Sequence, residues 1–192
     1  MNLKLLISCG VAALATSAAA QDSNALAVDW EALLTETAAP SHMENVDTIY
    51  SGWRFRASET QALQTDDFDN PGMIFVDQAI DLWAKVDCSE GKSCASCHEN
   101  VEDFACLRPT LPRVEDGELV TMENMINECR TDRMGAEPWK WSKGKMTAMK
   151  ALIGLQSRGM PVNVAIDGDA APFWEKGKEL YYTRVGQLDM AC

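Results

Sequence analysis

The run Cys94-Ala95-Ser96-Cys97-His98 constrains this chain more than any other feature of its sequence. Two thiols three positions apart, followed at once by an imidazole, have the spacing of a covalent c-type haem attachment site. The thiols can add to the two vinyl groups of one porphyrin, and the histidine can then reach the iron from the same side. We therefore predict that Cys94 and Cys97 bind haem c covalently and that His98 is an axial ligand of its iron.

Two other chemistries use closely spaced cysteines. A thioredoxin-like redox pair expects a surrounding βαβ pattern, which this sequence lacks. A zinc site is the second alternative, because four thiols could supply four sulfur ligands: Cys88, Cys94, Cys97 and Cys106. The haem interpretation is favoured because the motif stands in a chain with the marks of export.

The N-terminus carries those marks. Residues 1–20 contain one charge, Lys4, then a short apolar run and small residues ending at Ala20. The run is too short to span a bilayer, which takes about 20 helical residues, and the small residues suit a signal peptidase. Leu6-Ile7-Ser8-Cys9 is similar to a lipoprotein box, but most of the apolar stretch follows it instead of preceding it. We expect a cleaved signal peptide over residues 1–20, no membrane span, and a location in the periplasm.

The charge balance argues against two classes of partner. The chain has 17 Lys and Arg against 29 Asp and Glu, a net charge of −12. Such a surface repels nucleic acid and offers no basic patch to anionic lipid. We therefore expect no nucleic-acid partner, and the acidic surface favours solubility.

Hydrophobic periodicity favours a mainly α protein. Residues 21–44 are expected to form an N-terminal leader with a weak helical pattern. Residues 45–166 are expected to form one cytochrome c-like domain, because apolar residues recur there every three or four positions. The expected helices begin after Gly72, at Thr121 as N-cap and near Ser142. Residues 107–120, rich in Pro and Gly, are expected to be an irregular crossing.

A weak internal repeat extends the pattern beyond that domain. A fourth helical stretch starts near Pro172, and its Leu180-Tyr181 precedes Cys192 by twelve and eleven positions. Leu82-Trp83 precedes Cys94 by the same twelve and eleven positions. Repeated spacing indicates repeated structure. We expect residues 167–192 to be the incomplete start of a second cytochrome c-like domain, truncated at Cys192, the first thiol of its haem motif.

The sixth ligand of the first haem has several candidates. His42 is the only other histidine and falls in an expected loop before the domain. Met160 lies in a Gly-Met-Pro loop like the one that carries the axial methionine of small c-type cytochromes, but it follows the third helix, whereas that ligand precedes the last helix. Cys129 lies on the apolar stripe of the second helix, where a thiol is often only a small hydrophobe. We prefer Cys129 and keep Met160 as the alternative.

Two further cysteines flank the haem pair. Cys88 and Cys106 are eighteen residues apart, and an oxidising compartment favours a disulfide between them. Two independent buried thiols are the alternative.

Four strings, in this order along the chain, resemble the SoxA family of c-type cytochrome subunits. They are Gly91-Lys92-Ser93-Cys94-Ala95-Ser96-Cys97-His98, Ile126-Asn127-Glu128-Cys129-Arg130, Gly159-Met160-Pro161-Val162-Asn163-Val164 and Gly186-Gln187-Leu188-Asp189-Met190-Ala191-Cys192. The resemblance covers the chain from about Trp53 to its end. One string alone is weak evidence, whereas four in order are specific.

The resemblance implies two c-type cytochrome domains, each with a haem held between a histidine and a cysteine thiolate. Carried over by residue, Cys94 and Cys97 bind the first haem, with His98 and Cys129 as its axial ligands. Cys192 is then the first covalent cysteine of the second haem. Two haem c groups are expected in the complete protein.

The resemblance also implies an activity: joining thiosulfate to a cysteine of the SoxYZ carrier, as an L-cysteine S-thiosulfotransferase, with two electrons released to the partner cytochrome SoxX. The reactive cysteine of the family ligates the second haem and would lie beyond Cys192, so no catalytic residue is expected in residues 1–192. The residues alone leave a second function open, a simple monohaem periplasmic electron-transfer cytochrome with His98 and Met160 as axial ligands.

Overall fold

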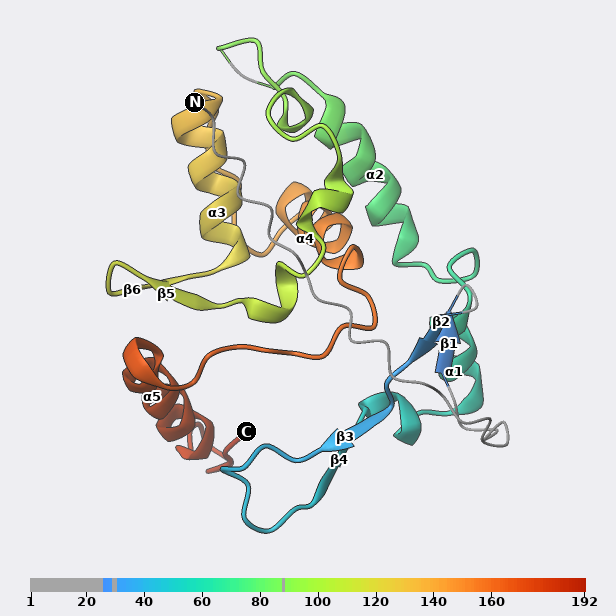
Figure 1. The fold of residues 1–192 in the computed structure, drawn as a ribbon, viewed down its shortest axis with the longest axis vertical. Coiled ribbons are helices and arrows are strands. Elements are labelled where there is room, and N and C mark those ends of the chain that lie inside the picture. Colours follow the sequence, from blue (N-terminus) through green and yellow to red (C-terminus); the bar gives the residue numbers. More distant parts are fainter. Residues whose placement is uncertain (1–25, 29–30, 88) are drawn as a thin grey trace, which may run out of the picture.

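The computed structural model describes residues 26–28, 31–87 and 89–192, and most of its regular structure is helical (Figure 1). The longer helices are α1 (Ser58–Thr65), α2 (Met73–Ala84), α3 (Met122–Glu128), α4 (Lys145–Leu155) and α5 (Ala171–Tyr182). Short 3-10 helices are η1 (Gly52–Phe55), η2 (Cys94–Ser96), η3 (Val101–Phe104), η4 (Arg108–Thr110) and η6 (Gly168–Ala170). The mainly α prediction is confirmed. No helix in this part of the chain is both long and apolar enough to cross a membrane.

The hydrophobic core lies where α2 packs against α4. Val76, Ala79 and Trp83 recur three and four positions apart on α2, so they share one face, and all three are buried. The facing side of α4 buries Met149 and Leu152 among others. Burying side chains of this size stabilises a fold by about 1.5–3 kcal/mol each. The periodicity therefore predicted these two helices correctly.

The helix expected to continue from Thr121 to about Asp132 changes form halfway. Thr121 is the N-cap as predicted: its Oγ1 accepts from the Asn124 N–H at 3.4 Å, and Asn124 Oδ1 accepts from the Thr121 N–H at 3.0 Å. The α-helix ends at Glu128, and a π-helical turn, η5, follows over Cys129–Arg133. The Met134 N–H donates to the Cys129 carbonyl, five residues back. Such π turns are frequent at functional sites.

The weak helix expected in the N-terminal leader is wrong. β1 (Leu26–Val28) pairs antiparallel with β2 (Glu31–Leu33), and β3 (Glu36–Ala38) pairs with β4 (Thr48–Tyr50). β-branched residues favour extended backbone over helix, and these strands carry them at Val28, Thr37, Thr48 and Ile49. The residues of the predicted signal peptide lie outside the described part of the chain.

The irregular crossing expected over residues 107–120 contains a hairpin. β5 (Arg113–Glu115) pairs with β6 (Glu118–Val120). The two turn residues, Asp116 and Gly117, have φ of +51° and +82°. Positive φ at both central positions matches the twist of a two-residue hairpin, and Asp-Gly is a favoured pair there.

The last helix stands apart from the core. Figure 1 shows α5 set away from α2 and α4, at the end of an extended segment that leaves α4. None of its residues is buried, and Leu180 and Tyr182 are among its exposed apolar side chains. One ring contact joins it to the N-terminal part, where His42 meets Trp174 edge-on at 5.4 Å. The helix predicted near Pro172 is thus confirmed, and its apolar side chains are exposed.

Candidate haem site

An apolar cavity opens between the C-terminal end of α2, the Cys94–His98 segment, α3 with η5, and α4. Its empty volume is about 630 Å³, counting the space open to solvent. The cavity is lined by Trp83, Cys94, His98, Phe104, Leu107, Met122, Met125, Ile126, Cys129, Arg130, Met149 and Ile153. Concave, mostly apolar cavities with a few polar groups are typical of cofactor sites.

The attachment motif forms a tight turn at the wall of this cavity. The Ser93 N–H donates to Ser96 Oγ at 3.0 Å, and the N–H groups of Cys97 and His98 both donate to the Cys94 carbonyl, at 3.2 and 3.0 Å. The turn places Cys94 and His98 in the lining, with Cys97 exposed beside them.

Aromatic rings surround the His98 imidazole. Its centroid lies 4.9 Å from that of Phe104 and 6.1 Å from that of Trp83. The rings of Trp83 and Phe104 in turn meet edge-on at 5.8 Å. The Phe104 ring packs edge-to-face against both His98 and Trp83, which is favourable at these distances, and the Trp83 and His98 rings are tilted. His98 is therefore held at the cavity wall by packing.

Cys94 and Cys129 both line the cavity, and the pKa of each thiol is raised. Burial raises the pKa of Cys94, repulsion from Cys129 adds to the rise, and the Arg130 guanidinium opposes it. Burial also raises the pKa of Cys129, with Cys97 adding to the rise and Arg133 and Arg130 opposing it. Each thiol therefore keeps its proton at neutral pH unless a metal ion or a covalent bond to the sulfur replaces that proton.

These residues fit a c-type haem. Apolar side chains suit the faces of a porphyrin, and Cys94 and Cys97 suit its vinyl groups. His98 and Cys129 are lining residues that can bind iron, and the thioethers of Met122, Met125 and Met149 also line the cavity. Cys129 is the first residue of the π turn, directly after α3 ends at Glu128.

The alternative ligands lie elsewhere. Met160 lines two other hollows, one with Pro109 and one with Leu33, and the residue is 39% exposed. His42 packs on α5, as described above. The structure therefore brings Cys129, and neither Met160 nor His42, to the cavity that His98 lines.

Comparison with known proteins places this cavity within a family. The profile described as SoxA/TsdA, cytochrome c domain, matches residues 78–162, which include every residue of the cavity lining. The chain is similar to the L-cysteine S-thiosulfotransferase subunit SoxA of Paracoccus pantotrophus, with 53% identity over 163 residues that make up 83% of this chain and 56% of the relative. It is also similar to the protein of that name from Rhodovulum sulfidophilum, with 47% identity over 189 residues, 96% of this chain and 66% of the relative.

A solved structure agrees. The crystal structure of SoxXA from P. pantotrophus superposes with a TM-score of 0.83 at 49% identity, over 90% of this chain and 67% of that one. The chain belongs to the SoxA family. It spans 56% and 66% of the length of the two relatives above. The prediction of a cytochrome c-like domain is confirmed, and its boundaries at residues 45 and 166 stay a prediction.

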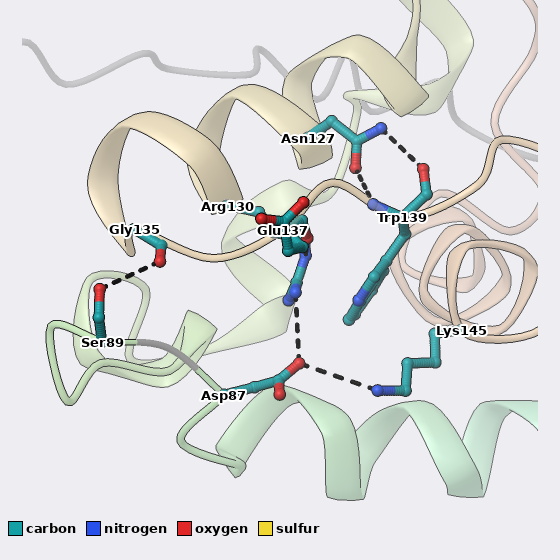
Figure 2. A network of polar contacts seen from close by, with 8 residues as sticks. All are labelled: Asp87, Ser89, Asn127, Arg130, Gly135, Glu137, Trp139 and Lys145. Atoms are coloured by element: carbon teal, nitrogen blue, oxygen red, sulfur yellow. Dashed lines mark hydrogen bonds and ion pairs between the residues drawn. The ribbon is translucent and has the colours of Figure 1, made fainter.

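The SoxA-family domain has a polar network behind the cavity that the sequence did not suggest (Figure 2). Arg130 is buried, with 4% of its surface exposed. Its Nε donates to the Glu137 carbonyl at 3.0 Å, and its NH2 group reaches Asp87 Oδ2 at 3.3 Å. Its guanidinium carbon lies 4.1 Å from the centroid of the Trp139 ring, a cation–π contact. The one available signal was its position next to Cys129 on an apolar stripe.

A second set of contacts holds Trp139 in place. Asn127 Nδ2 donates to the Trp139 carbonyl at 3.0 Å, and the Trp139 N–H donates to Asn127 Oδ1 at 2.8 Å. Lys145 Nζ lies 3.8 Å from Asp87 Oδ2 and 5.9 Å from the Trp139 ring. The network thus connects α3, η5, the segment before α4 and the end of α2.

The remaining predicted cysteines lie away from the cavity or outside the described part of the chain. Cys192 is exposed, beyond α5. Cys88 lies outside the described residues, so its disulfide with Cys106 stays a prediction. In the part of the chain that the structure describes, no three His, Cys, Asp or Glu side chains are arranged to hold a metal ion, so the zinc alternative gains no support from the geometry.

Proposed function

We propose that this chain supplies the first haem domain of a SoxA subunit in a periplasmic thiosulfate-oxidising complex. Cys94 and Cys97 hold haem c covalently, and His98 and Cys129 bind its iron. The observation that carries the proposal is that Cys94, His98 and Cys129 line one apolar cavity, within the residues that match the SoxA/TsdA cytochrome c domain.

Bound haem c supplies a one-electron redox centre, and a thiolate ligand donates electron density to iron and lowers its reduction potential. The chain's own residues exclude water from the cavity and orient the axial histidine. Met122, Met149 and Ile153 exclude water from the cavity, and the rings of Trp83 and Phe104 orient His98. This haem is therefore accessory to the reaction, a low-potential site with a structural role.

The activity proposed for the complete protein is L-cysteine S-thiosulfotransfer. A carrier cysteine thiol and thiosulfate form a new S–S bond, giving an S-thiosulfonate, with loss of the thiol proton and of two electrons. The electrons pass to a partner cytochrome, SoxX, and the carrier is SoxYZ. The reacting cysteine is expected after Cys192, which would be the first covalent cysteine of the second haem, so we assign no catalytic residue within residues 1–192.

The ligand assignment is tested by substituting each of the two candidate ligands, Cys129 and Met160, separately in the haem-loaded protein. Cys129→Ser should abolish the low-spin thiolate signal in electron paramagnetic resonance and shift the Soret band, because serine does not replace a thiolate on iron. Met160→Leu is the matched control and should leave both spectra unchanged. An unchanged spectrum in C129S with a changed one in M160L would favour the simple electron-transfer cytochrome instead.

The second haem motif is tested by the downstream coding sequence. It should continue with two residues, then Cys-His, and later a further cysteine; a stop codon directly after Cys192 would contradict the enzymatic proposal.

The signal peptide is tested by the N-terminus of the mature protein. Protein recovered from the periplasm should begin at Gln21, and an N-terminus that keeps residues 1–20 would contradict the signal peptide.

A further inference from the structure

Arg130 is the one buried charged side chain among the residues that the structure describes. A buried charge is costly unless it is paired and hydrogen-bonded. Apolar residues of similar size often serve stability as well or better. Its place beside Cys129 therefore calls for an explanation other than core packing.

Every contact of the guanidinium leads away from its own helix. It reaches Asp87, which follows α2, the carbonyl of Glu137 and the ring of Trp139, as Figure 2 shows. The backbone adds a fourth tie, because the Ala136 N–H donates to the Arg130 carbonyl at 2.8 Å. The turn that carries Cys129 is thus fixed to two other parts of the fold by the residue directly after the thiol.

The shape of the side chain matters as well as its charge. Nε serves one acceptor, NH2 serves another, and the flat face lies over an indole ring. A lysine can supply the charge but cannot make these three contacts together. Arg130 and Cys129 are consecutive residues of the same turn, and both line the cavity.

We propose that Arg130 is a positioning residue for Cys129, holding the π turn so that the thiol reaches the haem iron. The inference rests on the proposed role of Cys129 as ligand. Without the guanidinium, the Cys129–Arg133 turn loses its ties to Asp87 and Trp139. The thiolate then binds iron in only part of the population, and water or another group replaces it in the rest.

The test uses the haem-loaded protein and follows the low-spin thiolate signal, the amount of covalent haem and the melting temperature together. Arg130→Met should keep its covalent haem but lose most of the thiolate signal. Arg130→Lys should lose less of it, because the charge beside Asp87 remains. Asp87→Asn should lose part of the signal, because it weakens the ion pair between Asp87 and Arg130. If R130M does not accumulate, D87N tests in its place whether Arg130 positions Cys129.

Two control variants separate positioning from charge and from general stability. Arg133→Met removes an exposed positive charge from the same turn, and Lys145→Met removes the other cation near Asp87 and Trp139. Both should lose much less of the thiolate signal than R130M does. A full signal in R130M, or in D87N where R130M does not accumulate, overturns the proposal. Equal loss in R130M and R133M also overturns it, because charge alone would then explain the effect. An unchanged signal in C129S instead contradicts the ligand assignment itself.

Discussion

Helices α2 and α5 have the same spacing of apolar residues before a cysteine, yet α2 is packed into the core and α5 is exposed. Trp83 on α2 and Tyr181 on α5 each stand eleven positions before a cysteine, Cys94 and Cys192. Trp83 is buried against α4 and the haem cavity, whereas Tyr181 is 53% exposed. No residue of α5 is buried within the part of the chain that the structure describes.

The difference shows what an amphipathic pattern can and cannot specify. The pattern makes both segments helical, because each places apolar residues on one face. Burial needs a second apolar surface, and α4 supplies it to α2 through Met149, Leu152 and Ile153. In the described residues α5 meets no comparable surface, so most of the stability resides in residues 73–155. Exposed apolar faces of this kind mark sites of further contact.

The largest expected contrast between the two helices is in local opening. Amides in the middle of α2 and α4 should exchange only through global unfolding, at about 5–15 kcal/mol. Amides of α5 should exchange through local opening, with an opening free energy close to zero. Proteases should cut first within residues 167–192. Hydrogen exchange by mass spectrometry measures both regions in one experiment. Equal protection of α5 and α2 would break the comparison.

Substitution of the two corresponding aromatic residues, Trp83 on α2 and Tyr181 on α5, gives the next largest effect. Trp83→Ala removes a buried indole and should lower the free energy of unfolding by about 3–5 kcal/mol. Tyr181→Ala removes an exposed ring and should change it by no more than about 0.5 kcal/mol. Urea unfolding of the haem-loaded variants gives both values. Similar losses from the two substitutions would mean that α5 is packed as firmly as α2.

Local signals in the sequence predicted much of the fold and part of the site. The helices around Trp83, Leu152 and Leu180 follow from periodicity, and the haem motif is complete within five residues. The N-terminal strands were missed because each has only three residues, too few to show the alternation of apolar and polar residues that marks a strand.

The π turn and the role of Arg130 could not be predicted for a related reason. Nothing in the local sequence stops α3 at Glu128; the turn is fixed by contacts with Asp87 and Glu137, which come from other segments. Sequence order did favour Cys129 over Met160. The meeting of Cys129 with His98 in one cavity, however, depends on how α3 packs beside the attachment motif.

A smaller contrast concerns the ends of the helices. Thr121 caps α3 through its reciprocal hydrogen bonds with Asn124, and Thr121→Ala should cost about 1 kcal/mol of stability. Thr183 ends α5, where its hydroxyl donates to the Glu179 carbonyl at 2.7 Å on an exposed surface. Thr183→Ala should have no measurable effect on global unfolding, because α5 opens separately. A shift of the urea midpoint with T183A that matched the one with T121A would show that the helices unfold as one unit.

The smallest expected contrast is between two ion pairs, and it depends on pH. Lys150 Nζ donates to Glu123 Oε1 at 2.5 Å and joins α4 to α3 at a half-buried position. Burial alone raises the pKa of Glu123, but the hydrogen bond from Lys150 and bonds from the backbone and Thr121 outweigh it, so the pKa is lowered below its usual value. Arg184 and Asp189, beyond α5, are 3.7 Å apart and largely exposed.

A lowered folded-state pKa means that the Glu123 contribution is fully present above the unfolded-state pKa and is lost as the pH falls through the folded-state pKa. Glu123→Gln should therefore lower the free energy of unfolding by about 0.5–1 kcal/mol at neutral pH. The difference from the unsubstituted protein should disappear at acidic pH, where Glu123 is protonated. Asp189→Asn should change stability at neither pH, because solvent screens that pair. Urea unfolding of both variants at neutral and acidic pH measures the contrast, and a loss with E123Q that persists in acid would assign the effect to packing instead of charge.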